Sequence, residues 1–296
     1  HNPSGVAVNV AGGSANLTYT GLIEQTAINS AVVNVTGGHT GTLQFNELTD
    51  ADGSINATMG PGLVFDDADG TYNFNGTVEL NGAGAADTGI KVLNMTGSNE
   101  GRFTFADTNI TNPTGTAVVI NGLDTASATF TFTGDIMTDA SRPVAIADNT
   151  GGSITFSAAS TINSTGLGIL IQNNMDMTDR FAGQVVLDID TPAAIGLQVD
   201  GNTNGSTRFD DIAITTTTGD AVSITDNIDH NVTYTGDITT SGARPIDITG
   251  NNGGTMAFSN TGTVNSTGNG IRVDGNTDVT TQILGSGTLT TGVNQA

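Results

Sequence analysis

The stretch RPVAIADNTGGSITF, residues 142–156, returns 102 positions later as RPIDITGNNGGTMAF, residues 244–258. Both open with Arg-Pro, keep an Asn and a Gly-Gly in register, and end on Phe. Each contains two short runs in which apolar and other residues alternate, separated by a polar turn. Such alternation is typical of strands with one buried face. The duplication predicts a repeat protein, and the repeat has to be defined before the fold.

A recurrent aromatic residue gives the short period of this repeat. Intervals of 24 to 31 residues separate its members, and an Ile takes the last place. An apolar run precedes most members, and a third run, such as GDIMT or GDITT, follows many. The residues in this series are Tyr19, Phe45, Phe74, Phe105, Phe132, Phe156, Phe181, Phe209, Tyr234, Phe258 and Ile283.

Three short strands in each period of about 25 residues predict an all-β fold, a right-handed parallel β-helix solenoid of about eleven coils. At a strand spacing of about 4.8 Å, the rod is roughly 50 Å long. We expect the aromatic series to form one internal stack. An Asn also recurs in the turn after the first strand, and we expect these amides to form a hydrogen-bonded ladder. They are Asn149, Asn174, Asn202, Asn227, Asn251 and Asn276.

A longer repeat spans several coils. INSTGLGI at 162 returns as VNSTGNGI at 264, and FTGDIMT at 132 returns as YTGDITT at 234. Residues 1–296 are therefore predicted to be a single rod. In it, 89–191 and 193–295 are tandem four-coil copies, and 5–88 is a partial earlier copy with extra residues at 47–58 and 82–88. Tandem duplication of this kind favours a role in length or in repetitive surface.

The charge balance excludes several classes of partner. The net charge is −22 because only 7 residues are basic. Nucleic-acid binding needs clustered Lys and Arg, and anionic membrane surfaces repel a polyanion.

Cysteine is absent, so the chain has no disulfide or thiolate site. No apolar run reaches the length of a membrane helix. The chain begins HNPSG without Met, and we expect an export signal to have been lost upstream.

Phrases such as NTGGSITFSAASTINSTGLGI resemble the repeat arrays of large secreted bacterial surface and adhesin proteins. More broadly, the coils are similar to the right-handed parallel β-helix of the pectin-lyase-like superfamily. The resemblance covers nearly the whole chain. It implies a fold rather than an activity, because this fold carries lyases, hydrolases, adhesins and tailspikes.

The resemblance raises the hypothesis of a polysaccharide hydrolase or lyase. Hydrolases of this fold resemble one another in an Asn-Thr-Asp, an Asp-Asp, a Gly-His-Gly and an Arg-x-Lys motif. This chain has Asp210-Asp211, and Gly38-His39 is followed by Thr40, but Arg-x-Lys is missing and Lys91 is the only Lys. Adjacent strand residues point to opposite faces, so Asp210 and Asp211 are expected to be solvated turn acids rather than a catalytic pair.

The histidines and two acidic loops contain the side chains that could bind a metal ion. His39 and His230 fall in separate turns more than seven coils apart and are expected to be solvated, as is the terminal His1. TDADGS at 49–54 and FDDADGT at 65–71 match part of an acidic calcium loop, although both lack its first Asp and its final Glu. The alternatives are a metal-free Asx turn and a calcium site. The calcium ligands would be Asp50, Asp52, Asp66, Asp67 and Asp69.

These observations predict a non-catalytic extracellular structural protein, secreted or at the cell surface. It would serve as a stalk or adhesin segment, or assemble head to tail as a filament subunit. No segment reads as a cap, so we expect its partner to be a second copy of itself at the terminal coils. The resemblance leaves surface glycans open as another partner class. The alternative is a carbohydrate-active or carbohydrate-binding β-helix. Rows of Thr, as in TTTT at 215–218, suggest an ice-binding face only weakly, because the column varies among Thr, Ser, Asp and Ala.

Overall fold

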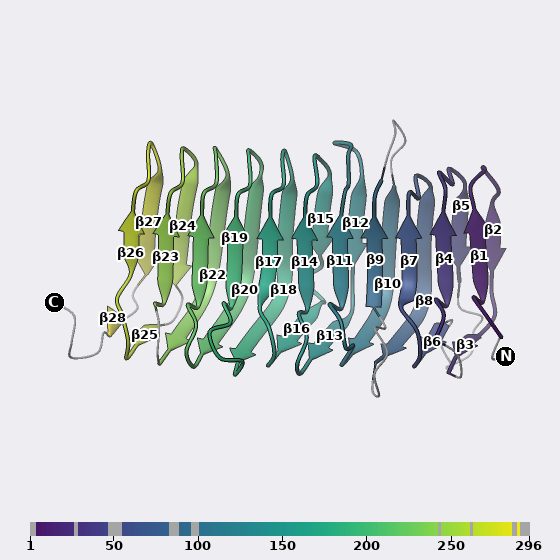
Figure 1. The fold of residues 1–296 in the computed structure, drawn as a ribbon, viewed down its shortest axis with the longest axis horizontal. Coiled ribbons are helices and arrows are strands. Elements are labelled where there is room, and N and C mark those ends of the chain that lie inside the picture. Colours follow the sequence, from purple (N-terminus) through teal and green to yellow (C-terminus); the bar gives the residue numbers. More distant parts are fainter. Residues whose placement is uncertain are drawn as a thin grey trace.

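The computed structural model describes residues 4–26, 29–46, 55–82, 89–95, 101–241, 244–260, 263–285 and 289–290. These residues form an all-β solenoid of about ten turns of about 26 residues, with parallel sheets and no helix. Figure 1 shows the rod from the side. The front strands point upward, the strands behind return downward, and the chain advances from right to left, which makes the coil right-handed. The predicted fold class is confirmed.

The first strand of each coil belongs to one parallel sheet of eleven strands, which faces the viewer in Figure 1. Its strands are β1 (Val8–Ala11), β4 (Val33–Thr36), β7 (Gly62–Asp66), β9 (Gly89–Leu93), β11 (Val118–Asn121), β14 (Val144–Ala147), β17 (Ile169–Gln172), β19 (Leu197–Asp200), β21 (Val222–Thr225), β23 (Ile246–Thr249) and β26 (Arg272–Asp274).

The second and third strands of each coil form two further ladders, and five long strands bend through both of them. The second ladder contains β2 (Leu17–Tyr19), β5 (Thr42–Phe45), β12 (Thr129–Phe132), β15 (Ser153–Phe156), β24 (Thr255–Asn260) and β27 (Thr280–Gly285). The third contains β3 (Ile23–Gln25), β6 (Ile55–Ala57), β13 (Asp135–Thr138), β16 (Thr161–Ser164), β25 (Val264–Ser266) and β28 (Leu289–Thr290). The long strands are β8 (Thr71–Asn81), β10 (Arg102–Thr111), β18 (Thr178–Ile189), β20 (Ser206–Thr216) and β22 (Asn231–Thr240).

The ladders run through the boundaries of the longer repeat without interruption. The predicted boundary near residue 192 falls between β18 and β19, and β17 pairs with β19 in register across it, from Ile169 opposite Leu197 onward. The described coils therefore make one rod. The derivation of that rod from tandem copies stays a prediction.

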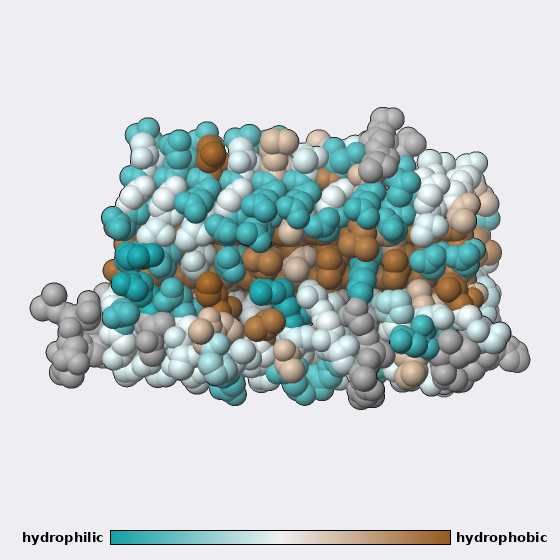
Figure 2. All heavy atoms as spheres, in the orientation of Figure 1, coloured by the Kyte–Doolittle hydropathy of each residue, from teal (hydrophilic) through white to brown (hydrophobic). Residues whose placement is uncertain are grey.

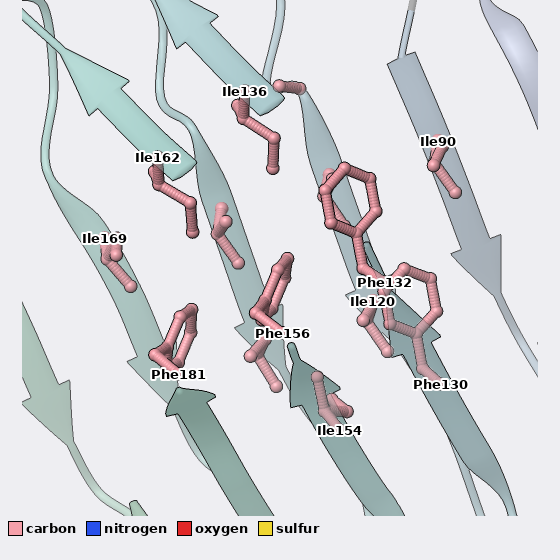
Figure 3. Close-up of a cluster of buried hydrophobic side chains, with 14 of the residues drawn as sticks. Ile90, Ile120, Phe130, Phe132, Ile136, Ile154, Phe156, Ile162, Ile169 and Phe181 are labelled. Carbon is pink, nitrogen blue, oxygen red and sulfur yellow. The ribbon is translucent and has the colours of Figure 1, made fainter. Parts of the chain in front are cut away.

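The recurrent aromatic positions form one column, as predicted, and its members from Phe45 to Phe258 are buried inside the rod. Strand register places all eleven positions, from Tyr19 to Ile283, opposite one another. Figure 3 shows Phe132, Phe156 and Phe181 projecting into the core among isoleucines. Parallel rings stack at 4.5–4.9 Å between centroids in the pairs Phe45–Phe74, Phe74–Phe105, Phe156–Phe181 and Phe181–Phe209.

The turn after the first strand explains why Gly, Asn and Asp recur there. The residue that follows each strand of the first sheet has positive φ, a conformation that Gly adopts freely and that Asn and Asp tolerate better than other side chains. The positions are Gly12, Gly37, Asp67, Asn94, Gly122, Asp148, Asn173, Gly201, Asp226, Gly250 and Gly275. From Ala68 to Asn251 the next residue in each coil is buried inside the rod, which is where the asparagines lie.

The Asn ladder is confirmed in detail. In the coil of Asn202, Oδ1 accepts from the backbone N–H of Asn174 at 3.0 Å and from its Nδ2 at 2.9 Å. Nδ2 of Asn202 donates to the Ile171 carbonyl at 3.1 Å and to Oδ1 of Asn227 at 2.9 Å. One side chain therefore joins three coils. The pattern repeats from Asn149 to Asn276, and Leu123 occupies the preceding position, where its N–H donates to Asn149.

The Arg-Pro pairs that open the stretches 142–156 and 244–258 lie at the entrances of strands of the first sheet. Pro143 precedes β14, and Pro245 precedes β23, so each proline lies at a strand entrance, where a residue without an N–H is tolerated. Each Pro carbonyl still accepts from the previous coil, from Val118 and Val222 respectively. The repeated Arg-Pro sequence therefore occupies the same corner in two coils.

The face of the rod seen in Figure 2 is largely polar. A brown band crosses the middle of the front face in that view. Strand register aligns the half-buried, outward-facing side chains of Val64, Val119, Ala145 and Leu170 along this sheet, with Lys91 among them. Among the described residues, no helix is long and apolar enough to cross a membrane.

Candidate functional site

The acidic loops are only partly described. Asp50 and Asp52 lie outside the described residues, whereas Asp66, Asp67 and Asp69 follow or end β7. Asp66 accepts from Asn94 Nδ2 at 2.9 Å, and Asp69 is buried with Oδ1 lacking a hydrogen-bond partner. Burial, and then the charges of Asp67 and Asp124, raise the pKa of Asp69. In the part of the chain that the structure describes, no three carboxylates or histidines are placed to hold a metal ion. Calcium at these loops stays a prediction.

The Asp210-Asp211 pair lies at the corner between the second and third strands. The expectation that the two side chains point to opposite faces is wrong. The register shifts between Phe209 and Ile212, and both acids lie outside the core between these two buried residues. A regular strand would have turned one of them inward, but the corner adds a residue.

Asp210 is held by two arginines, a contact that the sequence analysis missed. Arg180 donates to its Oδ2 at 2.9 Å, and Arg208 donates to its Oδ1. Although partial burial opposes it, hydrogen bonds from Arg208 and Arg180 lower the pKa of Asp210. The two arginines come from neighbouring strands, with Arg180 opposite Arg208 in the register of β18 and β20, which brings them together at one carboxylate.

The prediction that His39 and His230 are solvated turn residues is wrong, since both are buried. His39 lies beside Tyr72, 3.0 Å from Nδ1 to the phenol oxygen, and its Nε2 lies 2.8 Å from the Ala15 carbonyl oxygen. The neighbouring coils cover both rings, because a turn in one coil packs on the turns above and below it. Exposure of a turn residue in a solenoid therefore depends on its neighbours in space more than on its place in a loop.

His230 belongs to a buried polar cluster with Asp179 and Thr207. Asp179 and Thr207 lie opposite one another on β18 and β20, and both side chains point inward. Thr207 Oγ1 lies 3.4 Å from Asp179 Oδ2 and 3.0 Å from His230 Nε2. His230 Nδ1 contacts the backbone carbonyl oxygen of Asn204. Oδ1 of Asp179 has no hydrogen-bond partner among the described residues.

This polar cluster interrupts a column that is apolar or aromatic in the other coils from Leu43 to Met256. The same inward position carries Leu43, Tyr72, Phe103, Phe130, Ile154, Asp179, Thr207, Val232 and Met256 in successive coils. The sequence indicates this cluster, because Asp179 and Thr207 stand two residues before Phe181 and Phe209, where the other coils from Leu43 to Met256 have an apolar or aromatic residue.

Burial governs the protonation of this cluster. Desolvation raises the pKa of Asp179 to about 7, although the hydrogen bond from Thr207 opposes the shift. Desolvation lowers the pKa of His230, although the Asn204 carbonyl opposes that shift. Both groups therefore favour their neutral forms in the core, as buried ionisable groups without a charged partner do.

No protein-family model matches the chain, and neither a curated protein nor a solved structure matches it.

Proposed function

We propose that the chain is a non-catalytic structural rod of a secreted bacterial surface protein, serving as a stalk, an adhesin segment or a filament subunit. The observation that carries this proposal is the continuity of the interior. The aromatic column and the three strand ladders run through every described coil, and the Asn ladder joins six successive coils. Each coil needs its neighbours to bury its inner face, so this construction gives a rigid element of defined length. The resemblance to repeat arrays of bacterial surface proteins supports the same role.

The edges of the described rod support end-to-end contact. β1 and β26 are the outermost strands of the first sheet, and each pairs on one side only within that sheet. Val273 and Leu284, at the last described coil, are 51% and 57% exposed. Unpaired strand edges recruit further strands. The partner that we propose for such an edge is a second copy of the chain stacked head to tail.

The polysaccharide-enzyme alternative receives no support from the acids that suggested it. A glycosidase needs one carboxyl group with a raised pKa to act as general acid. Asp210 has the opposite shift, because its carboxylate is bonded to Arg208 and Arg180. Asp211 is exposed to solvent. Surface glycans as binding partners of the rod remain compatible with the structural role.

Electron microscopy and small-angle scattering over a range of concentrations test the proposal. We expect rods whose length grows in steps of one molecule, or a single rod that continues into further coils in native material. Strictly monomeric particles at high concentration, with ordered local structure over both end coils, would contradict end-to-end assembly. Hydrolysis or elimination of polygalacturonate that disappears in Asp211→Asn would contradict the non-catalytic assignment.

A further inference from the structure

The buried cluster of Asp179, Thr207 and His230 has the geometry of a hydroxyl nucleophile, its base and an electrophile. His230 Nδ1 faces a carbonyl oxygen, which can only accept, so Nδ1 carries the ring proton and Nε2 is the acceptor. The Thr207 hydroxyl, 3.0 Å away, then donates to Nε2. A hydroxyl that donates to a histidine of fixed tautomer is the arrangement that activates oxygen nucleophiles.

The Asp179 carboxyl group lies on the other side of the same hydroxyl. The Thr207 hydroxyl donates to Oδ2 across the 3.4 Å contact when Asp179 is ionised. When Asp179 is neutral, the carboxyl proton is donated to Oγ1 instead, and the hydroxyl proton is then available to His230. A protonated carboxyl group is electrophilic, whereas a carboxylate is not. The proton thus places the reactive form of the acid against the activated oxygen, with both side chains fixed on paired strands.

We propose that Asp179 and Thr207 condense to an ester bond inside the rod, with His230 as the catalytic base. Thr207 Oγ1 attacks Cγ of Asp179 while His230 Nε2 takes the hydroxyl proton. The tetrahedral intermediate then expels the protonated Oδ2 hydroxyl, and His230 returns the proton to it, so that one water leaves. One C–O bond forms, one C–O bond breaks, and no oxidant or reductant is needed.

Two physical conditions favour condensation over hydrolysis at this site. Groups held in contact reach effective molarities of about 10⁵–10⁸ M, which offsets the ordinary preference for the free acid and alcohol in water. The cluster is also fully enclosed, since all three side chains are at most 1% exposed, so few water molecules reach the bond once it forms. The ester would link two coils whose reacting residues are 28 positions apart. It would also remove a buried carboxyl group that otherwise lacks a full set of partners.

Intact-mass spectrometry of the denatured full chain tests the proposal. We expect a mass lower than that of the sequence by one water. Trypsin cuts after Arg102, Arg180 and Arg208 but not between Arg142 and Pro143, so Asp179 and Thr207 fall in the adjacent peptides 103–180 and 181–208. These should remain joined, or appear as 103–208, lighter by one water in either case. Hydroxylamine, which cleaves esters, should abolish the link.

Variants locate the bond and identify the base. Thr207→Val should keep the full mass, whereas Thr108→Val, a matched change at another fully buried threonine, should still lose water. Asp179→Asn should lose ammonia in place of water, which keeps the test valid if Thr207→Val does not fold. His230→Gln should slow the mass loss at least tenfold after refolding.

The full sequence mass in the folded native chain would overturn the proposal. Water loss that persists in Thr207→Val would also overturn it, because it would indicate a succinimide at an Asp-Gly pair such as Asp200-Gly201.

Discussion

Replacing Asn202 by Ala should destabilise the middle of the rod more than any surface change in the same coil. The substitution removes the acceptor of two donors of Asn174, its backbone N–H and its Nδ2, and both lie inside the rod. It also removes the donor that Nδ2 supplies to the Ile171 carbonyl and to Asn227. A buried donor left without a partner costs about 1–3 kcal/mol, so the two donors of Asn174 that lose their acceptor alone cost about 2–6 kcal/mol.

Chemical denaturation and amide hydrogen exchange measure this effect together. A solenoid can open at one interface while the remainder stays folded, so the exchange rates of amides near Asn174 and Asn227 report the local loss. Asn163→Ala on the outer face of β16 is the matched control and should change stability by about 0.5 kcal/mol or less. Asn202→Asp should be worse at pH 7 than in acid, because an ionised carboxylate there would face the Ile171 carbonyl oxygen. If Asn202→Ala matches the control in both assays, the ladder does not hold the coils together.

Four further outcomes follow from the described contacts. Phe156→Ala, in the stacked column, should cost about 3–5 kcal/mol, and an unmoved melting temperature would contradict the register. Thr108→Val should raise stability by about 1 kcal/mol, because its buried hydroxyl has no partner, and a loss in urea titration would argue against this. Thr207→Val keeps Asp179 as a free acid and removes the Thr207 hydrogen bond that opposes the effect of burial, which raises the pKa of Asp179 to about 7 in the native chain. The variant should therefore lose stability as the pH rises from about 4 through 7, and a flat profile would contradict this. Melts with calcium and with chelator should differ and become equal in Asp67→Asn/Asp69→Asn, whereas equal melts of the native chain would remove the calcium prediction.

The coil, the aromatic column and the Asn ladder could be predicted from the sequence because they depend on spacing alone. When Phe156 and Phe181 recur at the coil period, stacking the coils necessarily superimposes them, and the same holds for Asn149 and Asn174. Positions that depend on how a corner is built could not be predicted. Asp210 and Asp211 both face outward because the register shifts at that corner.

Burial of the histidines was unpredictable for a related reason. The residues that enclose His230 are supplied by other coils, as the contacts with Thr207 and Asn204 show. Turn composition, which suggested exposure, describes only the local chain. By contrast, Asp179 could have been identified from alternation, since it occupies an inward position between exposed Thr178 and Arg180.

The polar cluster is significant because the inner columns of the rod are otherwise regular. In a rod whose inner columns repeat, Asp179 occupies a position at which Phe130, Ile154 and Val232 stabilise the core of other coils by apolar contact. A single polar substitution at such a place is destabilising unless its hydrogen bonds are satisfied. Here Asp179, Thr207 and His230 come from three successive coils and contact one another in series. The Thr207 hydroxyl is the one group that touches both others. Its reaction with Asp179 would convert an incompletely bonded acid into a covalent link between two coils of the rod.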